Sequence, residues 1–177
     1  MHRLFVAIRP PEPIRDLLID AMDDSADFRW QDDQQLHLTL RFAGEVERPI
    51  ANDLGDALSR IHSDRFILRI AGVGCFEQRS SGALWAGVEP KPPVAALAAK
   101  VERVCQSVGL EPERRAFHPH ITLARWKGRR TREIQAYLER TASLSSEPFA
   151  VDEFMLFESR LSRHGAHYEA IVRYPLS

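Results

Sequence analysis

The sequence predicts an α+β fold of two pseudo-twofold-related lobes, each an antiparallel sheet with helices packed outside, around a central cleft. Two observations support this. The phrase His37-Leu38-Thr39-Leu40 returns as His120-Ile121-Thr122-Leu123, 83 residues later in a chain of 177. Strand-like and helix-like segments are also mixed without a sustained parallel βαβ rhythm. No low-complexity tract or linker divides the halves, so we expect residues 1–177 to form a single bilobal domain.

The repeat extends beyond the motif. At the same offset of 83 residues, Phe66 corresponds to Phe149 and Trp85 to Tyr168. Such correspondences with small insertions are typical of an internal duplication. We therefore expect two copies of one unit, at roughly 1–75 and 83–160, followed by a closing strand. If the copies pack about a pseudo-twofold axis, their histidine strands face each other.

The first copy opens with a strand at 3–8, which is too short and too soon interrupted to be a signal peptide. Residues 11–22 carry apolar side chains at helical spacing, and prolines at their start suit a first turn. A polar loop over 23–35 leads to a strand at 36–42. There the residues alternate, so His37 shares one face with Thr39 and the leucines share the other.

The first copy continues past Gly44, which we expect to break the strand. Residues 49–62 have apolar side chains on one face of a helix. A strand at 66–70 precedes a Gly-rich turn region, and another strand follows at 83–88.

The second copy repeats this order. Residues 92–108 form a helix with an apolar stripe, and 117–124 form the strand with the second motif. A helix is expected at 131–142, a strand at 149–157 and the closing strand at 167–174.

Composition narrows the class of protein. The net charge is −1, which argues against a protein that coats nucleic acid, and no apolar stretch is long enough to cross a bilayer. With two cysteines and no CxxC pair, a cytoplasmic location with reduced thiols is expected. The segment Arg114–Arg132 nevertheless holds seven basic residues and no acidic one. Charge runs are usually solvated surface, but this one flanks the second motif and could attract a phosphate backbone.

The two motifs permit acid–base chemistry on a phosphate. Two imidazoles with ordinary pKa values near ~6.5 can act as base and acid near neutral pH. One takes a proton from water or a hydroxyl, and the other gives a proton to the leaving oxygen. Thr39 and Thr122 each place a hydroxyl donor beside a histidine, where it can bind a phosphoryl oxygen.

A metal site is disfavoured. Neither motif contains a carboxylate, which two-metal phosphodiesterases need as a bridge. Two histidines are also too few for zinc, which takes three or four protein ligands. We therefore expect no metal and no cofactor.

Paired His-x-Thr motifs in the halves of a chain this size resemble the two-histidine (2H) phosphoesterases. The likeness is strongest to the bacterial and archaeal RNA 2′,3′-cyclic phosphodiesterases, also called 2′-5′ RNA ligases, and covers nearly the whole chain. It is carried by the following segments: Arg3–Ile8, His37–Gly44, Phe117–Arg125, Phe157–Ser159 and Gly165–Glu169.

This resemblance implies a metal-independent enzyme that opens a 2′,3′-cyclic phosphate at an RNA end and leaves a 2′-phosphate. It implies His37 as the proton donor and His120 as the proton acceptor, with Thr39 and Thr122 holding the phosphate. The near-symmetric strands themselves do not reveal which histidine is the acid. The expected partner is an RNA end or a small cyclic nucleotide, the expected state is a monomer, and no membrane is involved.

The residues five positions after each histidine are Phe42 and Arg125. Strict alternation places both on the face opposite the histidines, as a core aromatic and a surface arginine. The resemblance instead implies a ring that stacks on a base and a guanidinium that binds phosphate. A bulge or a strand end could redirect them in this way. Trp30 and Trp126 flank the motifs and are interpreted as packing residues, with stacking on a nucleotide as the alternative.

Three alternatives remain open. A reversible RNA ligase would use the same motifs, with a 5′-hydroxyl replacing water. A binding module would hold RNA ends without turnover, although binding alone needs no proton donor and acceptor. A structural or metal-carrying protein would respond to chelators, whereas the two-histidine enzyme would not.

Overall fold

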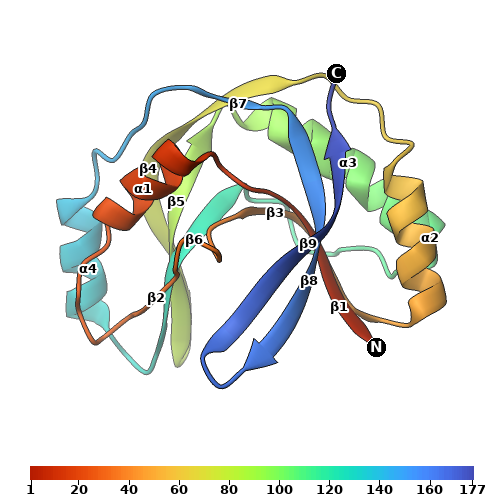
Figure 1. The fold of residues 1–177 in the computed structure, drawn as a ribbon. Coiled ribbons are helices and arrows are strands. Elements are labelled where there is room, and N and C mark those ends of the chain that lie inside the picture. The colour runs from red at the N-terminus through yellow and green to blue at the C-terminus, as the bar shows by residue number, and fades with distance from the viewer.

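The computed structural model describes residues 1–177 as one antiparallel nine-stranded sheet and four α-helices, which confirms the α+β class (Figure 1). The strands are β1 (His2–Ile8), β2 (Arg29–Trp30), β3 (Leu38–Val46), β4 (Phe66–Gln78), β5 (Ser81–Glu89), β6 (His120–Lys127), β7 (Phe149–Val151), β8 (Glu153–Ser162) and β9 (Gly165–Pro175). The helices are α1 (Glu12–Asp20), α2 (Arg48–Leu58), α3 (Lys91–Ser107) and α4 (Thr131–Arg140). No helix combines the length and apolar character needed to cross a membrane.

The strand order carries the symmetry of the repeat. It runs β7-β4-β5-β6-β3-β1-β8-β9, with β2 added to β6. In the repeat, β1 corresponds to β5, β3 to β6, and β4 to β7 and β8 together. The six strands from β4 to β8 therefore read the same from either end, with the pseudo-twofold axis between β3 and β6. The two motif strands are neighbours, paired at Leu38 and Ile121.

The lobes also meet where β4 pairs with β7. Phe66 pairs with Val151 and Leu68 with Phe149, so equivalent residues of the two copies lie across one axis. Each helix of the first copy packs beside a helix of the second copy. Helix α2 contacts α3 and β1, while the C-terminal end of α1 accepts a 2.9 Å hydrogen bond at the Ala21 carbonyl from Tyr137 of α4 (Figure 1).

Apolar packing occupies both faces of the sheet. The main core contains 34 buried residues, drawn from all four helices and one face of the strands. Along β1, Leu4 and Val6 belong to this core, whereas Phe5 and Ala7 join a small second cluster on the opposite face. Because alternate side chains of a strand point to opposite faces, this second cluster lies on the face of the sheet away from the main core.

Two predicted strand breaks are wrong, because these glycines lie inside strands. β3 continues through Gly44 (φ +79°), which pairs with Leu4. β4 continues through the Gly-rich region, where Gly72 (φ +76°) lies in an irregularity between Ile70 and Val73. A residue of positive φ in a bulge bends a strand without ending its ladder, and glycine adopts that φ at little cost.

Other boundaries also differ from prediction. The segment 149–157 is two strands rather than one, because β7 pairs with β4 whereas β8 pairs with β1 and β9. The expected loop at 23–35 contains the two-residue strand β2, held by β6. The motif strands begin only at Leu38 and His120. Both histidines therefore lie where a loop becomes a strand.

Candidate active site

The two motif histidines make the same hydrogen bond. Nδ1 of His37 lies 2.6 Å from the Gln35 carbonyl oxygen, and Nδ1 of His120 lies 2.5 Å from the carbonyl oxygen of His118. Because a carbonyl can only accept, each Nδ1 donates its hydrogen, which leaves Nε2 of the neutral ring as an acceptor. Both rings therefore offer the same nitrogen, as a base when neutral and as an acid when protonated.

Aromatic side chains fix both imidazole rings. The ring of His37 lies 4.8 Å from Phe5 and 5.3 Å from Tyr168. The ring of His120 lies 4.9 Å from Phe76 and 6.0 Å from Trp85. Phe5 on β1 and Trp85 on β5 lie on strands that correspond in the repeat, and each contacts the histidine of its own copy. Tyr168 lies on the closing strand β9 and adds a second ring beside His37.

Burial lowers the pKa of both histidines. Desolvation lowers the pKa of His37 to about 4, and the Gln35 hydrogen bond offsets only part of that effect. Desolvation also lowers the pKa of His120, against a smaller contribution from its hydrogen bond to His118. The positive charge of Arg125 lowers the pKa of both rings further. An anion bound between the two rings would raise both pKa values.

Matched bulges bring Phe42 and Arg125 to the histidine face. Relative to β5, β6 carries an extra residue between Thr122 and Ala124, and β3 carries one at Leu40 relative to β1. The pairs Leu40–Arg41 and Leu123–Ala124 are consecutive buried residues, which breaks the alternation. The opposite face expected from strict alternation is therefore wrong for both positions, and the physical reason is the extra residue in each strand.

The remaining predicted residues occupy the same face. Thr39 and Thr122 are half-buried, and neither hydroxyl hydrogen-bonds to another protein group. Phe42 is 40% exposed, and its ring stacks 6.5 Å from Phe5. Arg125 is exposed and has no ion-pair partner. All six predicted side chains thus lie on one face of the sheet around the axis.

Sequence reasoning missed the groups that support the histidines. Phe5 and Phe76 contact the rings, yet they read as ordinary strand residues, and Phe76 lies in the segment predicted as a turn. The Gln35 amide also holds the loop before His37 in place by a 2.9 Å hydrogen bond to the Ala166 carbonyl. One signal was available: the offset of 83 residues that links Trp85 to Tyr168 marked two aromatic positions now found at the site.

The tryptophans flanking the motifs are packing residues, as predicted. Trp126 is 5% exposed. Trp30 packs 5.5 Å from Phe28, and its Nε1 donates to the Ser25 carbonyl. Arg41, next to the bulge of β3, is buried and forms an ion pair with Glu102 on α3. Its role is therefore structural.

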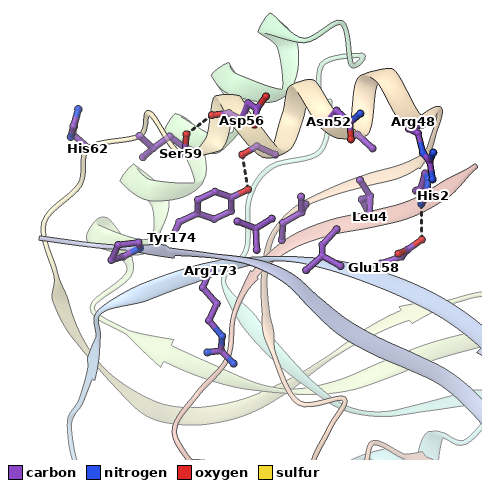
Figure 2. A pocket seen from close by; sticks show the side chains of 17 residues that line it. His2, Leu4, Arg48, Asn52, Asp56, Ser59, His62, Glu158, Arg173 and Tyr174 are labelled. Carbon is purple, nitrogen blue, oxygen red and sulfur yellow. Dashed lines mark hydrogen bonds and ion pairs between the residues drawn. The ribbon is translucent and has the colours of Figure 1, made fainter.

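No group of three or more His, Cys, Asp or Glu side chains is arranged to hold a metal ion. Both cysteines are free thiols, and burial raises the pKa of Cys105 to about 11. A hollow of about 930 Å³ lies between α2 and the strands β1, β8 and β9. Figure 2 shows the His2–Glu158 pair at one end of this hollow and Tyr174 toward the other. None of the predicted site residues lines it.

The chain is similar to characterised proteins over most of its length. Residues 10–163 match the 2′-5′ RNA ligase superfamily. The RNA 2′,3′-cyclic phosphodiesterase of Aeropyrum pernix is 34% identical over 143 residues, which cover 79% of this chain and 81% of that protein. The protein of the same name from Thermus thermophilus is 31% identical over 186 residues, covering 98% and 90%.

Solved structures also share this fold over almost the whole chain. The crystal structure of Escherichia coli LigT complexed with 3′-AMP is similar with a TM-score of 0.82 and 27% sequence identity. The match covers 99% of this chain and 98% of that one. A crystal structure described only as a phosphoesterase gives a TM-score of 0.83 at 28% identity, with the same coverage.

Proposed function

Because the chain belongs to the 2′-5′ RNA ligase superfamily, we propose that it hydrolyses 2′,3′-cyclic phosphate ends of RNA to 2′-phosphates. Its relatives named RNA 2′,3′-cyclic phosphodiesterase support this reaction. The observation that carries the proposal is the pair of imidazoles with identical Nδ1 hydrogen bonds on neighbouring, twofold-related strands. Binding alone needs no such matched pair of proton-transfer groups.

The reaction divides into two proton transfers. Water attacks phosphorus, the bond from phosphorus to O3′ breaks, and the product carries a 2′-phosphate and a free 3′-hydroxyl. Nε2 of neutral His120 takes a proton from the attacking water. Nε2 of protonated His37 gives a proton to the departing O3′. The assignment of acid and base follows the family resemblance, and the fixed tautomers suit either order.

In this proposal, binding of the anionic substrate favours the protonated form of His37, which then acts as the acid. In the free protein burial keeps His37 neutral, with a pKa of about 4. A phosphodiester anion between the rings favours the imidazolium and raises that pKa on binding. In this proposal, the hydroxyls of Thr39 and Thr122 and the guanidinium of Arg125 donate to the phosphoryl oxygens, where negative charge grows in the transition state.

The test is hydrolysis of a short RNA ending in a 2′,3′-cyclic phosphate, with EDTA present and the product isomer identified. We expect a 2′-phosphate. His37→Ala and His120→Ala should each lower kcat by about 10²–10⁴-fold, the usual contribution of one general acid or base. Exposed His164 lies in the turn between β8 and β9, so His164→Ala is the matched control and should retain activity.

Three results would overturn the proposal. These are absence of turnover by the intact protein, turnover that survives both substitutions, and turnover abolished by EDTA. The 3′-phosphate isomer as product would refute the assignment of O3′ as leaving group. Adding an RNA with a 5′-hydroxyl to the same assay measures strand joining, which uses the same two histidines with that hydroxyl in place of water.

We also propose a cytoplasmic, monomeric protein. The two free thiols suit a reducing compartment. Both histidines and all their supporting groups come from one chain, so the reaction needs no partner subunit. Sedimentation of the purified chain tests the monomer, and a mass twice that of one chain would contradict it.

A further inference from the structure

A second groove of about 890 Å³ begins beside the histidine site. It lies over β2, β5 and β6, next to the tip of β4. Five of its lining side chains are cationic and one is a carboxylate. They are Arg29, Arg115, Arg125, Lys127, Arg130 and Asp27.

Three of these cations lack a protein counter-charge. Arg130 pairs with Asp27, and Arg115 pairs with Glu113. Arg29, Arg125 and Lys127 are exposed and form no ion pair. Arg29 also lies directly opposite Arg125 in the β2–β6 ladder. Like charges in directly opposed positions destabilise a sheet, and an anion bound between them would remove that cost.

The groove is continuous with the catalytic face. Phe76 lines it, is 39% exposed, and contacts the His120 ring at 4.9 Å. Arg125 lines it as well, and its charge lowers the pKa of both histidines. Past the bulge of β6, Arg125 and Lys127 follow Thr122 along the same face. An anionic chain that starts at the histidines therefore meets a row of cations.

We propose that this groove binds the single-stranded RNA that leads up to the cyclic phosphate. This inference rests on the proposed function, because a strand that ends in a 2′,3′-cyclic phosphate continues only toward its 5′ end. Its phosphodiesters lie against Arg29 and Lys127, and a base stacks on the exposed ring of Phe76. The substrate class is then an oligonucleotide, and a cyclic mononucleotide leaves the groove empty.

Two measurements test this. The first is the ratio of kcat/KM for an RNA hexamer with a 2′,3′-cyclic phosphate end to that for a 2′,3′-cyclic mononucleotide. The second is the Kd, by fluorescence anisotropy, of a labelled RNA hexamer that ends in a 2′-phosphate and needs no turnover. The variant is Arg29→Gln/Lys127→Gln. The control, Lys91→Gln/Arg103→Gln, removes two exposed cations from α3 and changes the net charge equally.

We expect the double variant to lower the kcat/KM ratio and to weaken hexamer binding, each about tenfold, while the control matches the wild type. The slope of log Kd against log salt should fall by about 1.4, or about 0.7 for each lost phosphate contact. Because no second strand is present, these effects belong to the upstream strand and not to an incoming 5′-hydroxyl strand.

The outcomes separate the two proposals. An unchanged hexamer Kd in the double variant, or an equal loss in the control, overturns the groove whatever the activity. Weakened hexamer binding in the double variant, together with a wild-type protein that hydrolyses neither substrate, overturns the proposed function but supports the groove. A kcat/KM ratio near one for the wild type refutes the oligonucleotide preference.

Discussion

Acidification should destabilise the protein through His37. Its pKa falls from 6.5 to about 4 in the folded protein, mainly because the ring is buried among aromatic side chains. The native state thus holds this ring neutral where the unfolded chain protonates it. Below pH 6.5 the unfolded chain binds more protons, so the free energy of unfolding falls as the pH drops from 6.5 to about 4.

The size of this effect follows from the two pKa values. At pH 7 the ring is neutral in the native state and about one-quarter protonated in the unfolded chain, so its effect on stability is small. At pH 5 the unfolded form is almost fully protonated, whereas the native form is about one-tenth protonated. Linkage then gives a loss of about 2 kcal/mol between pH 7 and pH 5 from this one residue.

Urea unfolding at pH 7 and at pH 5 measures this loss of unfolding free energy. Wild type and His37→Asn are compared in phosphate-free buffer. Asparagine keeps an amide donor for the Gln35 carbonyl but does not titrate. We expect the variant to lose about 2 kcal/mol less than the wild type between pH 7 and pH 5. His164→Asn, which removes an exposed ring, is the control and should behave as the wild type. Equal losses in wild type and His37→Asn would refute the assignment of a depressed pKa to His37.

Further predictions concern activity. Since the pKa of each motif histidine is lowered in the free protein, and these are the proposed acid and base, kcat/KM should peak below about pH 6.5. The bound phosphate raises both pKa values, so kcat should peak at higher pH, and coinciding optima would contradict that. Arg125→Gln removes a positive charge that lowers both pKa values, so it should shift the kcat/KM optimum upward and raise KM; Arg125→Lys should restore the optimum. A Cβ at Gly74 would lie 2.4 Å from Cζ2 of Trp85, which packs on His120. Gly74→Ala should therefore cost about 1–3 kcal/mol of stability and lower kcat, whereas Gly55→Ala, with no atom nearer than 3.9 Å, should do neither.

The repeat predicted the tertiary arrangement well because symmetry constrains it. Once two copies of one unit share a sheet, the equivalent strands β3 and β6 meet at the axis and the order of the others follows. Alternation also placed His37 with Thr39 on the face opposite the leucines, and burial agrees. Local periodicity was sufficient there because no residue is inserted between the histidine and the threonine.

Periodicity failed where the backbone departs from it. A bulge shifts every later side chain to the other face, and no residue type in Leu123-Ala124 or Leu40-Arg41 marks one. Gly44 is compatible with either a strand end or a strand with positive φ, and only the pairing with Leu4 decides between them. Contacts such as Phe5 with His37 join segments that are distant in sequence, so they required the fold itself.

Symmetry supplies two equivalent histidines, but acid–base catalysis needs them to differ. The backbone treats them alike, since each Nδ1 donates to the carbonyl two residues earlier. The difference comes from side chains that the copies do not share. Three aromatic rings, of Phe5, Phe157 and Tyr168, surround His37, whereas two, of Phe76 and Trp85, lie against His120. Stronger desolvation makes His37 the harder ring to protonate in the free protein. If it is the acid, its proton must arrive with the anionic substrate, which restricts the active protonation state to the bound complex.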